Sequence, residues 1–211
     1  MFFDYLGRGV IVYLDDVLVY SGDIVSHTAL LGEVLAILAE NKMYPKISKC
    51  RFAMDSIDYL GYRVSAQGIT PSPVKVGAVR VWPEVLDNDT QVKQFMGTID
   101  YCRMFMGAEF TDLAKPLIDL TKKGTEFKWK PEHTAAVKAL KERLMNYTTL
   151  QISDPKRPFV LRTDASGFAV VAVLEQEGHP FGYLSKAMSP AEQKYATYDQ
   201  ELLAVTKPLA K

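Results

Sequence analysis

Two adjacent carboxylates, Asp15 and Asp16, stand between the apolar, β-rich segments 9–14 and 17–20. Two such segments around a two-residue acidic turn predict a tight β-hairpin. Neighbouring carboxylates repel each other, and a divalent cation removes that repulsion. Mg²⁺ prefers one or two protein carboxylates with water and substrate phosphates, so the pair favours two-metal phosphoryl transfer, completed by a carboxylate from elsewhere in the fold. The alternative is that Asp-Asp is only a favourable turn sequence.

A second pair of carboxylates lies in the last third of the chain. Asp164 follows a predicted strand, and Glu201 lies on a predicted helix. A carboxylate at a strand end that faces one on a helix is typical of a metal-dependent nuclease. The alternatives are an Asx-turn at Asp164 and, at Glu201 in the first helical turn, compensation of the helix dipole.

Several other kinds of site are excluded by what the sequence lacks. His27, His133 and His179 are far apart and have no cysteine beside them, so the spacing of a zinc site is absent. No glycine-rich phosphate loop precedes a helix, and no serine or cysteine nucleophile motif occurs. Cys50 and Cys102 form neither a CxxC motif nor a disulfide framework, which fits a reducing compartment.

The composition is that of a globular protein without a membrane segment. The 211 residues include 25 Lys+Arg and 25 Asp+Glu, and 48% of them are hydrophobic. Zero net charge argues against a free-standing, highly basic nucleic-acid-binding module. The longest apolar run, residues 168–174, is far shorter than the roughly 20 residues of a membrane helix, and no signal peptide is visible. We therefore expect an intracellular protein, cytoplasmic or nuclear, that is not secreted and not bound to a membrane.

The elements that would position the first carboxylate pair follow from the spacing of apolar residues. Helical spacing predicts a helix over residues 24–43 that lies across the hairpin. Residues 58–64 predict a second short hairpin with its turn at Gln67-Gly68. Four helices are then predicted, at 74–81, from an N-cap among residues 88–90 to Phe105, over 112–120, and from Pro131 onward.

The elements around the second pair are shorter and β-rich. Strands are predicted at 159–163, 168–174 and 181–184, with a turn at 164–167. The final helix begins with Thr197 and Gln200 as a capping box. Pro208 falls where this helix would continue, so the helix should be short or kinked.

The resulting fold class is mixed α+β in three parts. Pro71-Ser-Pro73 and Asp154-Pro155 are the predicted boundaries, which gives 1–70, 71–153 and 154–211. The middle part is helical and the flanking parts are β-rich. Residues 1–70 carry six basic and eight acidic residues, whereas residues 71–150 carry twelve and ten. The neutral total therefore hides an acidic first part and a basic second part.

A family resemblance rests on several motifs in order. The sequence VIVYLDDVLVYS at 10–21 closely resembles the YxDD hairpin of reverse transcriptases, in the form found in gypsy-type LTR retrotransposons. Further segments are similar to that family and cover nearly the whole chain: 49–52, 58–62, 64–69, 127–129, 158–160, 163–166, and Tyr195 with 201–205.

For the polymerase, the resemblance implies a partial palm over 1–70 and a helical thumb and connection over 71–153 that tracks the duplex. Asp15 and Asp16 would be the palm aspartates, with Asp15 the more direct ligand of Mg²⁺, or of Mn²⁺ in its place. Five residues would contact primer or nucleotide: Tyr13 and Leu14 beside the primer end or incoming nucleotide, and Leu60, Gly61 and Tyr62 in the primer grip. The implied partners are a primer–template and dNTPs.

For the third part, the resemblance implies the first half of an RNase H-like α/β domain. Asp164 and Glu201 would be the first two catalytic, metal-binding carboxylates, and the substrate would be an RNA–DNA hybrid. The third polymerase aspartate of the family lies upstream of the hairpin, and two later RNase H carboxylates lie downstream of the Glu201 helix. Val171 stands where the family often has Gly, and Pro208 interrupts its helix.

These departures predict a fragment of a retrotransposon polyprotein, inactive as an isolated chain, whose missing parts would be partners. One alternative is a non-catalytic nucleic-acid-binding remnant of a decayed or co-opted element. Another is a structural protein whose acidic turns are only turns. We also expect residues 1–70 to be the least stable part, because a palm hairpin without its neighbouring strands exposes a strand edge and apolar surface.

Overall fold

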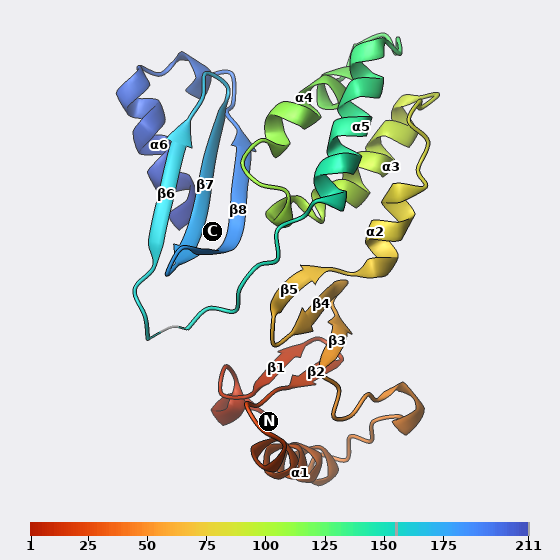
Figure 1. Ribbon diagram of the computed structural model, residues 1–211, viewed down its shortest axis with the longest axis vertical. Coiled ribbons are helices and arrows are strands. Elements are labelled where there is room, and N and C mark those ends of the chain that lie inside the picture. The colour runs from red at the N-terminus through yellow and green to blue at the C-terminus, as the bar shows by residue number, and fades with distance from the viewer. Residues whose placement is uncertain (155, 211) are drawn as a thin grey trace. The chain divides into compact units, whose positions relative to one another are not determined.

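The computed structural model describes residues 1–154 and 156–210, and its described elements are helices and three small sheets (Figure 1). This confirms the mixed fold class. The chain divides into two compact units, Met1–Tyr59 and Leu60–Lys211, which we call unit 1 and unit 2. The predicted boundaries near 71 and 154 stay predictions. Within the described part of the chain, no helix is long and apolar enough to cross a membrane.

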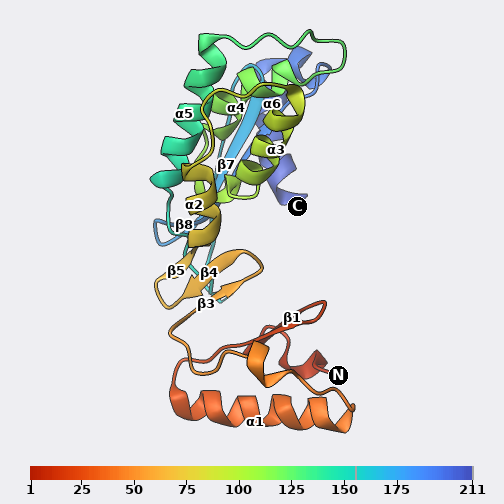
Figure 2. The ribbon, with the colours of Figure 1, turned by 90° about the vertical axis from the view of Figure 1, so that its right-hand side faces the viewer.

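Unit 1 is built on a hairpin and one long helix, which lie along each other in Figure 2. Its elements are η1 (Phe3–Tyr5), β1 (Val10–Tyr13), β2 (Asp16–Val19), α1 (Ile24–Glu40), η2 (Ile47–Lys49) and β3 (Ser56–Tyr59). The antiparallel register places Val10 opposite Val19 and Val12 opposite Val17. These four valines share one face and pack with Val34 of α1 in a small core.

The predicted first hairpin is confirmed, but its turn is shifted by one residue. The two turn residues are Leu14 and Asp15, and Asp16 is the first residue of β2, paired with Tyr13. Helix α1 is also confirmed, although it ends at Glu40 and not at Met43, and its start has a clear cause. The Asp23 carboxylate accepts a hydrogen bond from the Ser26 backbone N–H at 2.8 Å, which caps the helix.

Unit 2 begins with β4 (Tyr62–Ser65), which pairs antiparallel with β5 (Gly68–Pro71). The second predicted hairpin is therefore present, but the predicted turn Gln67-Gly68 is wrong by one residue, because Gly68 opens β5. A side chain at Gly68 would meet the Leu150 carbonyl oxygen at 2.2 Å. Glycine is required there because Ile69 and Leu150 exchange backbone hydrogen bonds of 2.7 and 2.9 Å.

The helical middle follows as α2 (Pro73–Arg80), α3 (Asp89–Asp100), η3 (Arg103–Phe105), α4 (Phe110–Leu120) and α5 (Pro131–Met145). Asn88 is the N-cap of α3 and accepts from the Gln91 N–H at 2.9 Å. The expectation that this helix reaches Phe105 is wrong, since α3 ends at Asp100 and a 3₁₀ turn carries Phe105. Helices α3, α4 and α5 bury the main core.

The C-terminal part is an antiparallel sheet of β6 (Val160–Ala165), β7 (Ala169–Gln176) and β8 (His179–Ala187), followed by η4 (Glu192–Lys194) and α6 (Thr197–Leu209). The predicted turn at 164–167 begins too early, because β6 continues through Asp164 and Ala165. The expected Thr197 capping box is wrong: Ala196 is the N-cap, with no side-chain hydrogen bond. Pro208 lies in the last turn of α6, so the helix ends one residue later.

Candidate functional site

The first candidate site is the tip of the β1–β2 hairpin, which carries Tyr13, Leu14, Asp15 and Asp16. Leu14 has a φ of 51° and is 85% exposed, so a bulky apolar residue occupies the left-handed region in water. That conformation is uncommon for a residue other than glycine, and such backbone strain clusters at functional sites. Tyr13 is 55% exposed next to it.

The two carboxylates at this tip are uncompensated. Asp15 and Asp16 are both exposed, and among the described residues neither forms an ion pair or a hydrogen bond through its carboxylate. One titratable group that feels the charge of Asp16 is Tyr59, a residue that sequence reasoning missed. Burial raises the pKa of Tyr59, and the charge of Asp16 raises it further. Its hydroxyl is buried without a hydrogen-bond partner in the described part of the chain.

The second candidate site is the turn Leu60-Gly61-Tyr62 in unit 2. Leu60 and Gly61 have φ values of 49° and 75°, the two positive angles of a type I′ turn. The Tyr101 hydroxyl donates a hydrogen bond to the Leu60 carbonyl. Its ring stacks on Tyr62, with centroids 4.8 Å apart and planes 16° from parallel. Burial, then the hydrogen bond with Tyr101, raise the pKa of Tyr62.

Gly61 is held closely by residues of the helical part. The Lys75 ammonium lies 3.1 Å from the centroid of the Tyr101 ring. A Cβ atom at Gly61 would come within 2.9 Å of both the Lys75 side chain and the Tyr101 hydroxyl. The turn is therefore fixed by α2 and the end of α3, which a local sequence pattern does not reveal.

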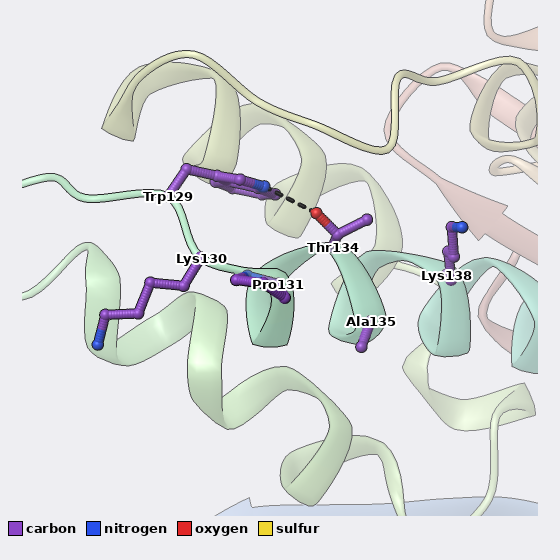
Figure 3. A pocket seen from close by; sticks show the side chains of 6 residues that line it. All are labelled: Trp129, Lys130, Pro131, Thr134, Ala135 and Lys138. Carbon is purple, nitrogen blue, oxygen red and sulfur yellow. Dashed lines mark hydrogen bonds between the residues drawn. The ribbon is translucent and has the colours of Figure 1, made fainter.

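Two grooves lie on the helical part of unit 2. One of about 530 Å³ runs between α2 and α3, and its lining includes Lys75, Lys93, Gly97 and Tyr101. Two of these residues, Lys75 and Tyr101, are also the ones that contact the turn at Gly61. The other, of about 500 Å³, lies at the start of α5, where the Trp129 indole N–H donates to Thr134 at 2.9 Å (Figure 3).

The third candidate site is the pair Asp164 and Glu201. Asp164 lies in β6 opposite Val171, which in turn lies opposite Ser185 of β8. Helix α6 packs against β6 and β7, on the side of Ala165, Val170 and Ala204. Strand alternation therefore points Asp164 to the face opposite α6. Both carboxylates are exposed, and the structure brings their elements together without placing them on one face.

The predicted residues therefore form three separate groups. Within residues 1–154 and 156–210, no cluster of three or more His, Cys, Asp or Glu residues has the arrangement of a metal site. Each carboxylate pair supplies two ligands at most. That number suits Mg²⁺, which binds proteins through one or two carboxylates and takes its other ligands from water and phosphate.

Two family models match the chain. Residues 2–64 match the model described as reverse transcriptase (RNA-dependent DNA polymerase). Residues 129–211 match the model described as an RNase H-like domain found in reverse transcriptase. The first match includes the hairpin carboxylates and the turn at Gly61, and the second includes Asp164 and Glu201.

Curated relatives extend the similarity to almost the whole chain. The retrovirus-related Pol polyprotein from transposon 297 of Drosophila melanogaster is 34% identical over 201 residues, which are 95% of this chain and 19% of the relative. The transposon Tf2-3 polyprotein of Schizosaccharomyces pombe is 33% identical over 205 residues, 95% of this chain and 15% of the relative. The chain thus spans less than a fifth of each relative's length.

Solved structures show the same fold. A foamy viral protease-reverse transcriptase in complex with an RNA/DNA hybrid matches with a TM-score of 0.87 and 22% identity, covering 98% of this chain and 29% of that one. The same kind of viral protein in complex with dsDNA matches with a TM-score of 0.83 and 23% identity, covering 99% of this chain and 44% of that one.

Proposed function

Because the chain belongs to the reverse transcriptase and RNase H region of retrotransposon Pol polyproteins, we propose that it contributes parts of two active sites for two-metal phosphoryl transfer. We call each of these incomplete sites, which has two carboxylates, a half-site. One half-site would serve RNA-directed DNA synthesis of the gypsy type, and the other would cut the RNA strand of an RNA–DNA hybrid. The observation that carries this proposal is the pair of exposed, uncompensated carboxylates at the tip of the hairpin.

Asp15 and Asp16 fit a divalent cation by their chemistry. Both present hard oxygen ligands to water, and no described cation neutralises them. Mg²⁺ is the proposed ion, with Mn²⁺ as an alternative. Bound there, the ion would neutralise charge on substrate phosphates. The hairpin's own contribution is to hold two carboxylates together on strands whose other face is packed against α1.

Five further residues, two in unit 1 and three in unit 2, would position substrates. Tyr13 and Leu14 present apolar surface beside the carboxylates, which suits contact with a primer end or the base of an incoming dNTP. Leu60, Gly61 and Tyr62 form a rigid turn pinned by Tyr101. We infer that this turn contacts the primer strand, because rigid positioning makes up most of the catalysis in phosphoryl transfer.

Asp164 and Glu201 would serve the hybrid-cleaving site. Asp164 is fixed by the pairing of β6 with β7, and Glu201 lies near the start of α6. Since Asp164 points away from the face that α6 covers, a cation shared with Glu201 would require further ligands to bridge the two carboxylates. We propose that both residues ligate Mg²⁺ only when such ligands are supplied.

The 211-residue polypeptide alone should therefore have little polymerase or RNA-cleaving activity. Each half-site has two carboxylates, and two-metal catalysis requires more ligands than that. Further parts of the polyprotein are the proposed partners. An apolar stripe on α6 supports this, because its members recur at helical spacing and are exposed: Tyr198, Leu202, Val205 and Leu209.

The test combines metal binding with turnover. Titration of Mn²⁺ into the purified chain, followed by calorimetry, should show a site that Asp15→Asn and Asp16→Asn weaken about tenfold or more, equivalent to about 1.4 kcal/mol. Asp55→Asn, an exposed carboxylate elsewhere in unit 1, is the matched control. Primer extension by the isolated chain would contradict the half-site proposal, and unchanged Mn²⁺ binding in both variants would contradict the metal role.

A second function has its own observation. The groove between α2 and α3 offers the Lys75 ammonium beside the aromatic Tyr101, which suits a non-catalytic remnant that binds nucleic acid. Salt-dependent binding of a labelled hybrid, without cleavage even after the remaining polyprotein regions are supplied in trans, would favour this second function. Cleavage restored in trans would favour the first.

A further inference from the structure

The stretch between α1 and β3 carries a charge pattern unlike the rest of unit 1. In Figure 1 it is the orange loop that leaves the end of α1 and returns to β3. Four of the five Lys and Arg residues of unit 1 lie in it, and residues 42–52, which we call the basic segment, contain no acidic residue. The four cations are all exposed: Lys42, Lys46, Lys49 and Arg51.

These cations are unpaired. Among the described residues, none of the four forms an ion pair with a carboxylate. Some exposed lysines of unit 2 are paired instead, since Lys93 lies 2.7 Å from Asp89 and Lys122 lies 2.6 Å from Asp119. The basic segment therefore presents positive charge that the protein itself does not neutralise.

A backbone turn holds two of these lysines near each other. The Lys49 N–H donates to the Lys46 carbonyl at 2.8 Å across the 3₁₀ turn η2. This hydrogen bond closes a backbone turn with Lys46 as the residue before η2, so the two lysines are held near each other along the chain. Like charges in such a pair repel, and phosphates of a bound polyanion would remove the repulsion.

Exposed apolar side chains alternate with these cations. Tyr44 is 78% exposed, Ile47 is 80% exposed and Phe52 is 46% exposed. Proteins that bind single strands combine a basic surface with aromatic rings on which unpaired bases stack. The bases of a duplex already stack on one another, so this combination favours an unpaired strand over a duplex.

We propose that the basic segment is a binding site for single-stranded nucleic acid, with Lys46 and Lys49 on phosphates and Tyr44 stacked on a base. The site goes beyond the proposed function, because it needs no metal, no hybrid and none of the four carboxylates. It recognises backbone charge and the faces of bases, so it has no sequence preference of its own.

The test measures binding of a fluorescein-labelled oligothymidylate to the full chain by fluorescence anisotropy over a range of salt concentrations. Lys46→Ala with Lys49→Ala should reduce the salt slope by about 1.4, since each phosphate contact on a single strand contributes about 0.7. Tyr44→Ala should weaken binding about fivefold or more, whereas Tyr44→Phe should retain it because the ring remains.

Controls separate this site from general electrostatics and from the metal sites. The double variant Lys122→Ala with Lys123→Ala removes two exposed lysines of unit 2 and should leave the salt slope unchanged. Added EDTA should leave binding unchanged as well, whatever becomes of the metal proposal. The proposal is overturned if the parent chain does not bind the single strand, if Tyr44→Ala binds as the parent does, or if a duplex competes as well as the single strand.

Discussion

Unit 1 and unit 2 differ most in how they are held together. Unit 1 has a core cluster of three buried side chains, Phe2, Val10 and Val34. The main core of unit 2 has seventeen described residues, with Phe95, Phe105 and Phe110 fully buried among them. A chain of about 60 residues buries little surface on folding, so the smaller unit is expected to be marginal alone.

The same difference separates the candidate sites. The Asp15–Asp16 tip stands on a two-stranded hairpin and is exposed, whereas the turn at Gly61 is fixed by Tyr101 and Lys75 from the helical core. A large core thus allows one functional loop to be rigid in isolation. The Asp15–Asp16 tip stands on strands that only α1 supports, so we expect that it needs contacts with other parts of the polyprotein to become rigid.

Hydrogen exchange is expected to show the largest contrast between the units. Amides of β1 and β2 should exchange through a local opening of unit 1, while those of α5 should exchange only through unfolding of the unit 2 core, which has a much higher free energy. The full chain is labelled for a series of times and then digested, and mass spectrometry of the peptides measures exchange in each segment. Protection that is highest in the hairpin would reverse the comparison.

Truncation of a core side chain in unit 2 should have the next largest effect, on the free energy of unfolding. Leu140 is fully buried, so Leu140→Ala should lower the free energy of unfolding of unit 2 by about 2–5 kcal/mol. Trp82 and Trp129 are the two tryptophans of the sequence, and both lie in unit 2. Tryptophan fluorescence during urea unfolding therefore reports unit 2 alone.

Two variants serve as controls for this truncation. Leu202 is 61% exposed, so Leu202→Ala should change stability by no more than about 0.5 kcal/mol. Val34→Ala lies in the core of unit 1 and should leave the tryptophan transition where it is. A shift of that transition by Val34→Ala would show that the units unfold together.

The sequence predicted the elements better than their ends. Apolar spacing located the hairpin and the helices, because burial of one face determines both. It misplaced the first turn, since the positive φ of Leu14 is imposed by the strand pairing rather than by a preference of leucine. The same apolar spacing wrongly extended α3 to Phe105, because this residue lies in a 3₁₀ turn and is nevertheless buried in the core that α3 packs against.

The sites were predicted in part for a related reason. Asp15, Asp16, Asp164 and Glu201 are visible as residue types in motifs. The contact of Tyr101 with Leu60 joins residues far apart in the chain, and no local pattern signals it. The face on which Asp164 lies depends on the register of β6 with β7 and on the side that α6 covers.

Substitution of two glycines with nearly equal φ angles should have a smaller effect on the free energy of unfolding, and the effect should differ between the two units. Gly7 has a φ of 73° and open space around it, whereas Gly61 has a φ of 75° and is in contact with Lys75 and Tyr101. Gly7→Ala should cost about 1–2 kcal/mol of unit 1 stability from backbone strain alone. Gly61→Ala should cost unit 2 about 1 kcal/mol more, because it also disturbs the Tyr101 hydrogen bond.

Exchange of the β1 amides measures the first variant, and tryptophan fluorescence during urea unfolding measures the second. If the two variants cost the same, the contacts of Tyr101 and Lys75 add nothing to the rigidity of the turn at Gly61. The larger cost at Gly61 is expected because only that position combines a left-handed φ with close neighbours.

The smallest expected effect is a loss of unit 2 stability at acid pH. The Lys207 ammonium donates to Glu192 at 2.8 Å and, with the Ser189 backbone N–H, lowers the pKa of Glu192 from 4.5 to about 2. The lowered pKa means that the unfolded chain binds more protons than the folded one between these values. The stabilisation is therefore complete above about pH 4.5 and disappears as the pH falls toward about 2.

Glu192→Gln should flatten the dependence of unit 2 stability on pH in this window, and Lys207→Met should flatten it in the same way because it removes the donor. Urea unfolding followed by tryptophan fluorescence at several pH values measures the slope. Unit 1 should show no corresponding change in exchange at its β1 amides, since both residues lie in unit 2. An unchanged slope in both variants would mean that the Glu192–Lys207 pair does not link unit 2 stability to pH.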